Sequence, residues 1–357
     1  MSMTAAPLFK QGDLAFARVL PATAKSYARE VTKFINFASV HELQVTTISD
    51  LDWVAAQYIR DLHGKSINKK GKSRAVRLLA GLVLFYPPCE GQLHWLTACT
   101  KGWAKEVPRA SWTPMSIEMA SLVAASFAKQ GRDDLAVATL TSFGALLRIG
   151  EFTKIKRRHI TFGPEAKLPT VAGAHAASIR LYNTKAKVHD SARVMWGDAA
   201  SVLHAYVEKR QFADEDRVFP FSAQTFRKHF ARTCSALGFR TSGAPLVPHS
   251  LRHGGATWLY ETVGLTIEEV AEVGRWSTHD SVRTYLKSGR TLMLDNSMSR
   301  STAELCIKAY TLMLDVFIGV FGKDIFRIVA EREHQWRRLR AVVAASGAPQ
   351  SARRLVF

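Results

Sequence analysis

Three stretches that lie far apart in the chain decide its fold: "LLRIGEF" at 146–152, "PHSLRHGGAT" at 248–257 and "GRWSTHDSVRTYL" at 274–286. The first ends an almost wholly apolar segment, where an arginine must be paired or must face an anion because it cannot easily reach water. In the second, a histidine and an arginine stand three residues apart, so they would share one face of a helix. In the third, a tyrosine follows a tryptophan by nine residues and lies among alternating polar residues.

A fourth stretch, "NTKAK" at 183–187, adds a lysine between the first two. Together the four stretches supply six candidate site residues: Arg148, Lys185, His249, Arg252, Trp276 and Tyr285. This set resembles the tyrosine recombinase, or phage-type integrase, family, whose members carry Arg, Lys, His-x-x-Arg, His or Trp, and Tyr in this order. "LRIGE" matches the family's first box, with Glu151 as a supporting residue, and the resemblance covers roughly residues 112–290.

The resemblance implies a role for each residue in breaking a DNA phosphodiester. Arg148 and Arg252 would grip one phosphate, because a guanidinium donates two hydrogen bonds at once and keeps its charge. Tyr285 would be the nucleophile. Since the free pKa of tyrosine is about 10, it needs a cationic pocket to stabilise its phenolate. Arg148 has an alternative role in a buried ion pair with Glu151.

The remaining three residues would move protons or donate to the phosphate. Lys185 would be the general acid for the leaving 5′ oxygen, and Lys187, two residues further on, stays open as the alternative. His249 would shuttle protons and hydrogen-bond the phosphate. Trp276 can donate only its indole N–H, and it stands where many relatives carry histidine. The product would be a 3′-phosphotyrosyl link that stores the bond energy, so neither ATP, a metal nor any other cofactor is expected.

Several neighbouring residues compete with these assignments. Tyr260 and Tyr310 are the other candidate nucleophiles, and the apolar face around Tyr260 favours a place in the core. We expect His253 to be structural, and Arg275 and His279 to be exposed beside the tryptophan. A zinc site on the two histidines of "PHSLRH" lacks a third ligand, and no carboxylate cluster indicates a metal-dependent nuclease.

Composition favours a nucleic acid as partner. The 49 Lys and Arg against 30 Asp and Glu give a net charge of +19, which attracts a polyanion; an anionic membrane surface is the rival. No apolar run is long enough to span a membrane, the start of the chain lacks a secretion signal, and the four cysteines are scattered. We therefore expect a soluble, intracellular, DNA-associated protein without membrane contact or a small-molecule substrate.

A chain of 357 residues predicts more than one domain. We expect a helical domain at 1–106, a linker at 107–114, a catalytic domain at 115–295 and an apolar helical tail at 296–357. The predicted fold is mainly α with a small antiparallel β-sheet, and it resembles the family's core-binding and catalytic domains, which form a C-shaped clamp on DNA. The tail either packs on its own domain or docks onto a neighbouring protomer in a homotetramer.

Local patterns add finer expectations. The basic run "KSINKKGKSR" predicts DNA contacts from Lys65, Lys69, Lys70, Lys72 and Arg74. Ser49 and Asp52 are spaced as a capping box, and Thr113 is expected to cap a helix at 115–130. The next helix is expected at 133–149. The runs "ASIRLY" and "ARVMW" predict strands, with Lys185 near the hairpin tip.

Three functions fit these patterns. The first is site-specific strand exchange by a recombinase, integrase or mobile-element transposase acting on double-stranded DNA with a specific target site. The second is a type IB topoisomerase, which shares the site residues but works as a monomer; the apolar tail after Tyr285 favours the assembling kind. The third is a non-catalytic DNA-binding protein with the same fold, against which the intact set of six residues argues.

Overall fold

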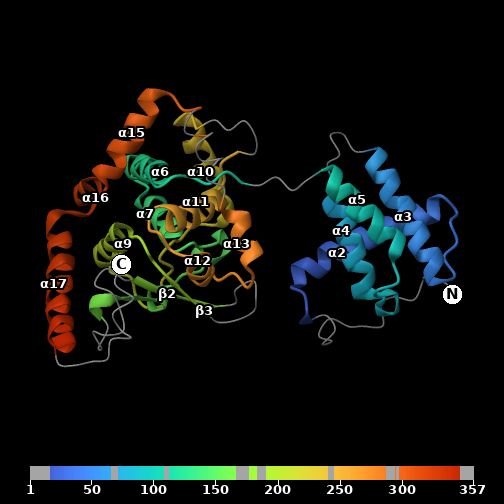
Figure 1. Ribbon diagram of the computed structural model, residues 1–357, viewed down its shortest axis with the longest axis horizontal. Helices are drawn as coiled ribbons and strands as arrows, with labels where there is room; N and C mark the ends of the chain where they lie inside the picture. Colours follow the sequence, from blue (N-terminus) through green and yellow to red (C-terminus); the bar gives the residue numbers. More distant parts are fainter. Residues whose placement is uncertain are drawn as a thin grey trace. The chain divides into compact units, whose positions relative to one another are not determined.

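The computed structural model describes residues 17–65, 71–107, 112–165, 177–182, 190–239, 245–286, 294 and 297–345. The chain divides into two compact units, Met1–Arg109 and Ala110–Phe357 (Figure 1). This division falls inside the stretch 107–114, where the composition indicates a linker. Each unit has an apolar core of its own, so each is described by itself.

The described part of the first unit is helical. Its elements are α2 (Pro21–Val40), α3 (Ile48–Gly64), α4 (Lys72–Phe85), the 3-10 turn η2 (Pro87–Cys89) and α5 (His94–Glu106). Helix α2 packs against α4, and α3 packs against α5. Their apolar faces meet around Phe34, Leu78 and Leu96, which are fully buried. Helix α4 ends just before two prolines, which cannot continue it.

The start of α3 differs from the predicted capping box. Thr47, not Ser49, is the N-cap: its hydroxyl accepts from the backbone of Asp50, and the Asp50 carboxylate accepts from the backbone of Thr47 at 2.9 Å. Asp52 is instead buried, and its carboxylate accepts two backbone N–H bonds at the start of α5, each 2.8 Å long. The pairs Thr47–Asp50 and Ser49–Asp52 have the same spacing and overlap in the sequence. Asp52 is held by tertiary contacts, which the local sequence does not show.

A buried polar network joins three helices of this unit. Glu30 of α2 is 3% exposed, and its Oε1 accepts hydrogen bonds of 2.8 Å from both Tyr58 of α3 and Arg74 of α4. Arg74 Nη2 also donates to the Tyr58 hydroxyl at 2.6 Å. Arg74 is therefore committed to an internal ion pair, which favours a structural role over the predicted phosphate contact.

The second unit is mixed α and β. Its helices are α6 (Ile117–Lys129), α7 (Asp133–Gly144), α8 (Ile149–Phe152), α9 (Gly197–Arg210), α10 (Ala223–Ala236), α11 (Pro248–Glu261), α12 (Ile267–Gly274), α13 (His279–Tyr285), α15 (Arg300–Thr311), α16 (Met313–Phe321) and α17 (Lys323–Ala345). Short 3-10 turns, η3 (Arg157–His159) and η4 (Gly163–Glu165), flank the first strand. Helix α7 forms the centre: its residues 135–144 are all buried, and α6, α9 and α11 pack around it.

A small antiparallel sheet accompanies the helices. Its strands are β1 (Ile160–Phe162), β2 (Ala177–Leu181) and β3 (Asp190–Arg193), in the order β1-β2-β3. Side chains of β2 alternate between buried and exposed, as expected of a strand with one face on a core. The predicted fold class, mainly α with a small antiparallel sheet, is confirmed. Lys185 and Lys187 fall between β2 and β3, outside the described residues.

Two helix boundaries differ from the predicted ones. Helix α6 begins at Ile117 with Ser116 as its N-cap, because Ser116 rather than Thr113 accepts from the backbone of the helix. Helix α7 ends at Gly144 instead of continuing to 149. The chain then turns through Leu146, whose φ is +49°. After this turn, Arg148 has an extended backbone conformation and is no longer part of the apolar helix.

The C-terminal segment packs on its own unit. Figure 1 shows α15, α16 and α17 following one another along one side of it, beside α6 and α9, with which they are in contact. Met313, Phe317 and Phe321 are part of the main apolar core, whereas Leu305 and Ile307 on α15 are exposed. Among the described helices, none combines the length and apolar character needed to cross a membrane.

The buried network gives a stability prediction. Replacing Arg74 with alanine leaves the buried Glu30 carboxylate without its cation, so the urea-unfolding transition of the first unit should lose about 3 kcal/mol. Lys65→Ala is the matched control. Its ion pair with Asp61 is exposed at the Lys65 end, and such pairs contribute about 1 kcal/mol or less. Equal stability of the two variants would contradict the structural role of Arg74.

Candidate functional site

Tyr285 and His249 meet although they are far apart in sequence. Tyr285 ends α13, His249 lies in the first turn of α11, and the tyrosine hydroxyl is 3.2 Å from His249 Nε2. The ring of Tyr285 stacks on His253 with centroids 4.2 Å apart and lies 4.5 Å from the ring of Trp276. These contacts hold the hydroxyl beside the imidazole, and His253 packs against the tyrosine ring.

Two glycines allow α11 to approach the centre of the unit. A Cβ on Gly254 would lie 1.8 Å from the carbonyl oxygen of Met115, and one on Gly255 would lie 2.3 Å from that of Phe143. Neither backbone oxygen can move away easily, so only glycine fits at these positions. The two glycines of "HGG" therefore determine how closely α11 packs against the centre of the unit. This packing in turn determines where His249 and Arg252 lie.

Arg252 is a fully buried cation that joins all three stretches. Its Nη1 donates to the carbonyl oxygen of Leu146, and its Nη2 donates to that of Gly274. Its guanidinium carbon lies 4.4 Å from the ring centroid of Trp276 and 5.7 Å from that of Tyr285. Burial, together with the neighbouring arginines, lowers the pKa of Arg252 to about 9, so it remains charged at neutral pH. Its Nε is buried without a hydrogen-bond partner in the described structure.

Arg148 presents a second cation next to Arg252. Its Nη1 pairs with Glu151 Oε1 at 2.8 Å, and its backbone N–H donates to Glu151 Oε2 at 2.8 Å. The Arg148 side chain is 30% exposed, so it is reachable from solvent, whereas Glu151 is 8% exposed. Burial raises the pKa of Glu151, but the bonds from Arg148 and the charges of Arg275 and Arg148 outweigh it and leave the carboxylate with a lowered pKa. Arg148 therefore forms the ion pair with Glu151 that the sequence offered as an alternative role, yet its side chain stays partly exposed.

His249 is held in its neutral form. Burial is the largest cause, and the positive charges of Arg252 and Arg148 add to it; together they lower the pKa of His249 to about 4. A neutral imidazole can take a proton from the phenol it contacts, whereas an imidazolium cannot. The geometry and the charge state of His249 therefore both suit a proton acceptor for Tyr285.

Trp276 packs between the arginine and the tyrosine. Its indole N–H is buried and has no hydrogen-bond partner among the described residues. The preceding Gly274 makes room for the ring, because a Cβ there would lie 1.7 Å from it. Two buried donors, the Trp276 N–H and the Arg252 Nε–H, thus accompany the Tyr285 hydroxyl in one site, which suits an anion.

Arg275 differs most from the sequence-based expectation. It was predicted to be exposed, but its side chain is 7% exposed and donates to backbone oxygens of the turn before Arg148. His279, expected to be exposed as well, has 58% of its side chain exposed. One feature of the sequence could have indicated this burial: Arg275 directly precedes Trp276 in the third stretch, so a charged residue adjoins a buried segment.

The competing tyrosines lie elsewhere. Tyr260 is 41% exposed on α11, so the prediction that it belongs to the core is wrong. It points outward because the helix buries its glycine-containing face instead. Tyr310 on α15 is 40% exposed and has its ring 6.3 Å from that of Trp196. Neither hydroxyl has a hydrogen bond to a described histidine or arginine, in contrast to Tyr285.

The predicted DNA-contact residues are in different situations. Lys65 is 71% exposed and pairs with Asp61 at 2.8 Å. Lys72 donates to the carbonyl oxygen of Val107. Lys69 and Lys70 fall outside the described residues. Lys65 is therefore exposed enough to reach a phosphate, whereas Lys72 donates to the backbone of Val107.

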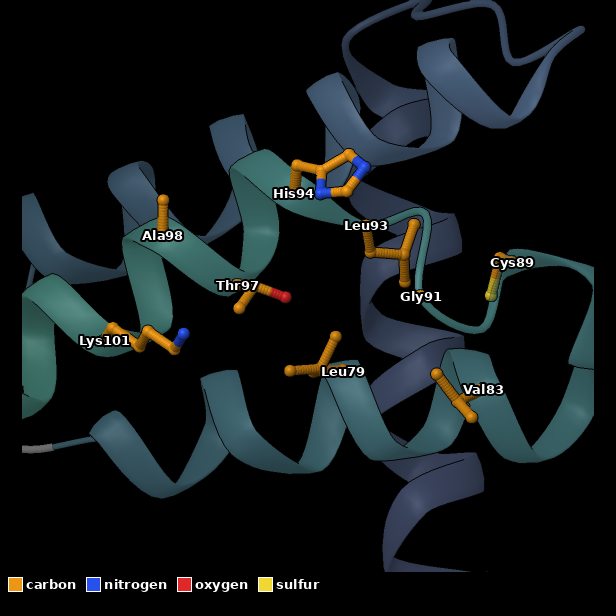
Figure 2. Close-up of a pocket in the computed structure, with 9 residues that line it drawn as sticks. All are labelled: Leu79, Val83, Cys89, Gly91, Leu93, His94, Thr97, Ala98 and Lys101. Carbon is orange, nitrogen blue, oxygen red and sulfur yellow. The ribbon is translucent and has the colours of Figure 1, made fainter.

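A separate cavity of about 430 Å³ lies in the first unit. Figure 2 shows it between α4, which contributes Leu79 and Val83, and α5, which contributes Thr97 and Lys101. None of the six candidate site residues lines it. In the part of the chain that the structure covers, no three histidine, cysteine or acidic side chains gather as metal ligands would.

Comparisons with known proteins indicate a family and a fold. Residues 117–290 match the model of the phage integrase family. The structure of a lambda integrase dimer bound to a COC′ core site is 14% identical, with 77% of this chain and 91% of that chain covered and a TM-score of 0.51. The Tn1549 transposon integrase in complex with transposon right end DNA is 13% identical, with coverage of 76% and 98% and a TM-score of 0.50. No curated protein sequence is significantly similar to this chain.

The solved structures share the fold at low identity, and the family model covers the segment that holds all six candidate site residues. By this match, residues 117–290 form a domain of the phage integrase family.

Proposed function

We propose that this protein exchanges DNA strands at a specific target site through a covalent 3′-phosphotyrosyl intermediate, with Tyr285 as the nucleophile. The observation that carries the proposal is the Tyr285 hydroxyl, 3.2 Å from a neutral His249 and beside the buried Arg252 cation. A phenol held between a proton acceptor and a fixed positive charge is arranged for attack on a phosphodiester.

The proposed step balances in charge and atoms. The Tyr285 oxygen attacks the phosphorus, the bond from phosphorus to the 5′ oxygen breaks, and the phenolic proton passes to His249 Nε2. Lys185 gives a proton to the departing 5′ oxygen. Attack by a 5′ hydroxyl of a second DNA end reverses these transfers and releases Tyr285. The phosphotyrosyl bond keeps the energy of the broken bond, so the proposal involves neither ATP nor a metal ion.

The arginines have different tasks in this proposal. Because Arg252 uses both Nη groups on backbone oxygens, it offers the phosphate its fixed charge and its Nε–H. The Trp276 N–H would be the second rigid donor. Arg148 is partly exposed and would close onto the phosphate from the solvent side. Each donor aimed at the developing charge in a dry site is worth roughly 3–4 kcal/mol of barrier.

Double-stranded DNA is the proposed partner. The net charge of +19 favours a polyanion, and the two solved structures of similar fold are described as bound to a core site and to transposon right end DNA. We propose that Lys65, Lys69 and Lys70 contact phosphates and that the domains clamp the duplex. We also propose a homotetramer on DNA, in keeping with the exposed apolar residues Leu305 and Ile307 on α15.

The nucleophile assignment gives the first test of this function. Incubation with a nicked, labelled target duplex should give a covalent protein–DNA adduct on a denaturing gel. Tyr285→Phe should abolish the adduct and leave duplex affinity within about twofold, because only the attacking oxygen is lost. Tyr260→Phe is the matched control, since Tyr260 is a partly exposed tyrosine of the same unit.

The same assay separates the alternatives. An adduct that persists in Tyr285→Phe would refute the nucleophile assignment. The absence of any adduct with the wild-type protein would leave a DNA-binding protein without catalysis. Relaxation of any supercoiled plasmid, without a requirement for two sites, would favour the type IB topoisomerase.

The lowered pKa of His249 gives a pH prediction. The imidazole titrates near 6.5 in the unfolded chain and at about 4 in the folded one, so the unfolded chain binds more protons between these values. Stability is therefore fully present above pH 6.5 and falls as the pH drops towards 4, by about 1.4 kcal/mol per unit of pKa shift at most. Urea unfolding should show a flatter dependence in His249→Gln across this window. An unchanged slope would contradict the buried neutral imidazole.

A further inference from the structure

Arg275 occupies a backbone conformation that is unfavourable for it. Its φ is +57° and its ψ is 48°, in the left-handed region that favours glycine. A residue with a Cβ persists there only when the surrounding contacts determine its place. The side chain of Arg275 supplies such contacts, and three of its four hydrogen bonds reach Ala145, Leu146 and Glu151 around Arg148.

The guanidinium of Arg275 is fastened to the turn before Arg148. Its Nη1 donates to Val273 at 3.0 Å and Ala145 at 3.4 Å, and its Nη2 donates to Leu146 at 3.1 Å, all at backbone oxygens. The Leu146 oxygen also accepts from Arg252. Two buried arginines therefore hold one carbonyl of the turn whose Leu146 has a φ of +49°.

Arg275 also shares the carboxylate that holds Arg148. Glu151 Oε1 pairs with the Arg148 guanidinium, while Oε2 accepts the Arg148 backbone N–H and Arg275 Nη2, the latter at 3.3 Å. Glu151 and Arg275 are 8% and 7% exposed, so this pairing is shielded from solvent. One carboxylate thus pairs with two arginines, so Arg148, Glu151 and Arg275 together carry a net positive charge.

We propose that Arg275 is a positioning residue for strand cleavage: it neutralises Glu151 and fixes the turn at Leu146, so that Arg148 keeps both its charge and its angle for the scissile phosphate. Without Arg275, Glu151 would pair with Arg148 alone and hold it away from the DNA. This inference rests on the proposed function and adds a residue to it that does not itself contact the phosphate.

Arg275→Gly is the informative variant, because glycine accepts the left-handed conformation while the guanidinium is removed. Gln211→Gly is the matched control. Gln211 is an exposed residue at φ +52° at the C-terminal cap of α9, outside the site. The Gln211→Gly variant shows the effect of glycine at a left-handed position without the loss of a contact in the site. Both variants are made in the full chain.

The measurement is the single-turnover rate of adduct formation on a nicked target, together with duplex affinity. Arg275→Gly should slow cleavage by about 100-fold, as expected when a positioned group is displaced, and should leave affinity within about twofold of wild type. Gln211→Gly should cleave at the wild-type rate. Arg275→Lys keeps the charge without the planar fork, so it should recover part of the rate.

A double-mutant cycle separates positioning from general structure. If Arg275 acts through Glu151, removal of Arg275 should slow cleavage much less in a Glu151→Gln background than in the wild-type background. Equal slowing in both backgrounds would overturn the proposal, as would wild-type cleavage by Arg275→Gly. If Arg275→Gly does not fold, a folded Arg275→Lys that cleaves at the full rate overturns it equally. A wild-type protein that forms no adduct would instead contradict the proposed function itself.

Discussion

The burial of one cation, Arg252, is the constraint on which the rest of the site depends. A guanidinium taken out of water needs hydrogen-bond partners, and both Nη groups of Arg252 find them in the carbonyl oxygens of Leu146 and Gly274. These oxygens belong to the turn before Arg148 and to the end of α12. Arg252 itself lies on α11. A single side chain therefore ties together the three stretches of sequence that carry the site.

The small residues around Arg252 follow from the same constraint. Gly254 and Gly255 let α11 approach the Met115 and Phe143 backbone, and Gly274 leaves space for the Trp276 ring. The ring in turn covers the guanidinium at 4.4 Å. Burial of His249, together with the positive charge enclosed in this way, lowers its pKa and keeps it neutral beside Tyr285. Packing and electrostatics thus act on the same pair of atoms, between which the proposed mechanism transfers a proton.

The candidate site residues could be chosen from the sequence because the four stretches resemble the family's pattern, whereas spacing alone indicated only that His249 and Arg252 share a helix face. The helices followed from apolar periodicity, and the small sheet followed from short β-prone runs. The misjudged residues depend on tertiary contacts. Arg275 was expected at the surface, since neither its left-handed backbone nor its carbonyl partners can be read locally. Arg74 sits in a basic run, yet pairs with Glu30, 44 residues away.

The proposed mechanism requires distant stretches to converge so that Tyr285 attacks the phosphorus held by Arg148 and Arg252. Mass spectrometry of the trypsin-digested protein–DNA adduct identifies the attacking residue. The mechanism predicts a nucleotide attached through its 3′ phosphate to Tyr285, in the tryptic peptide of residues 284–287. Attachment to Tyr260, to Tyr310 or to a serine would contradict it.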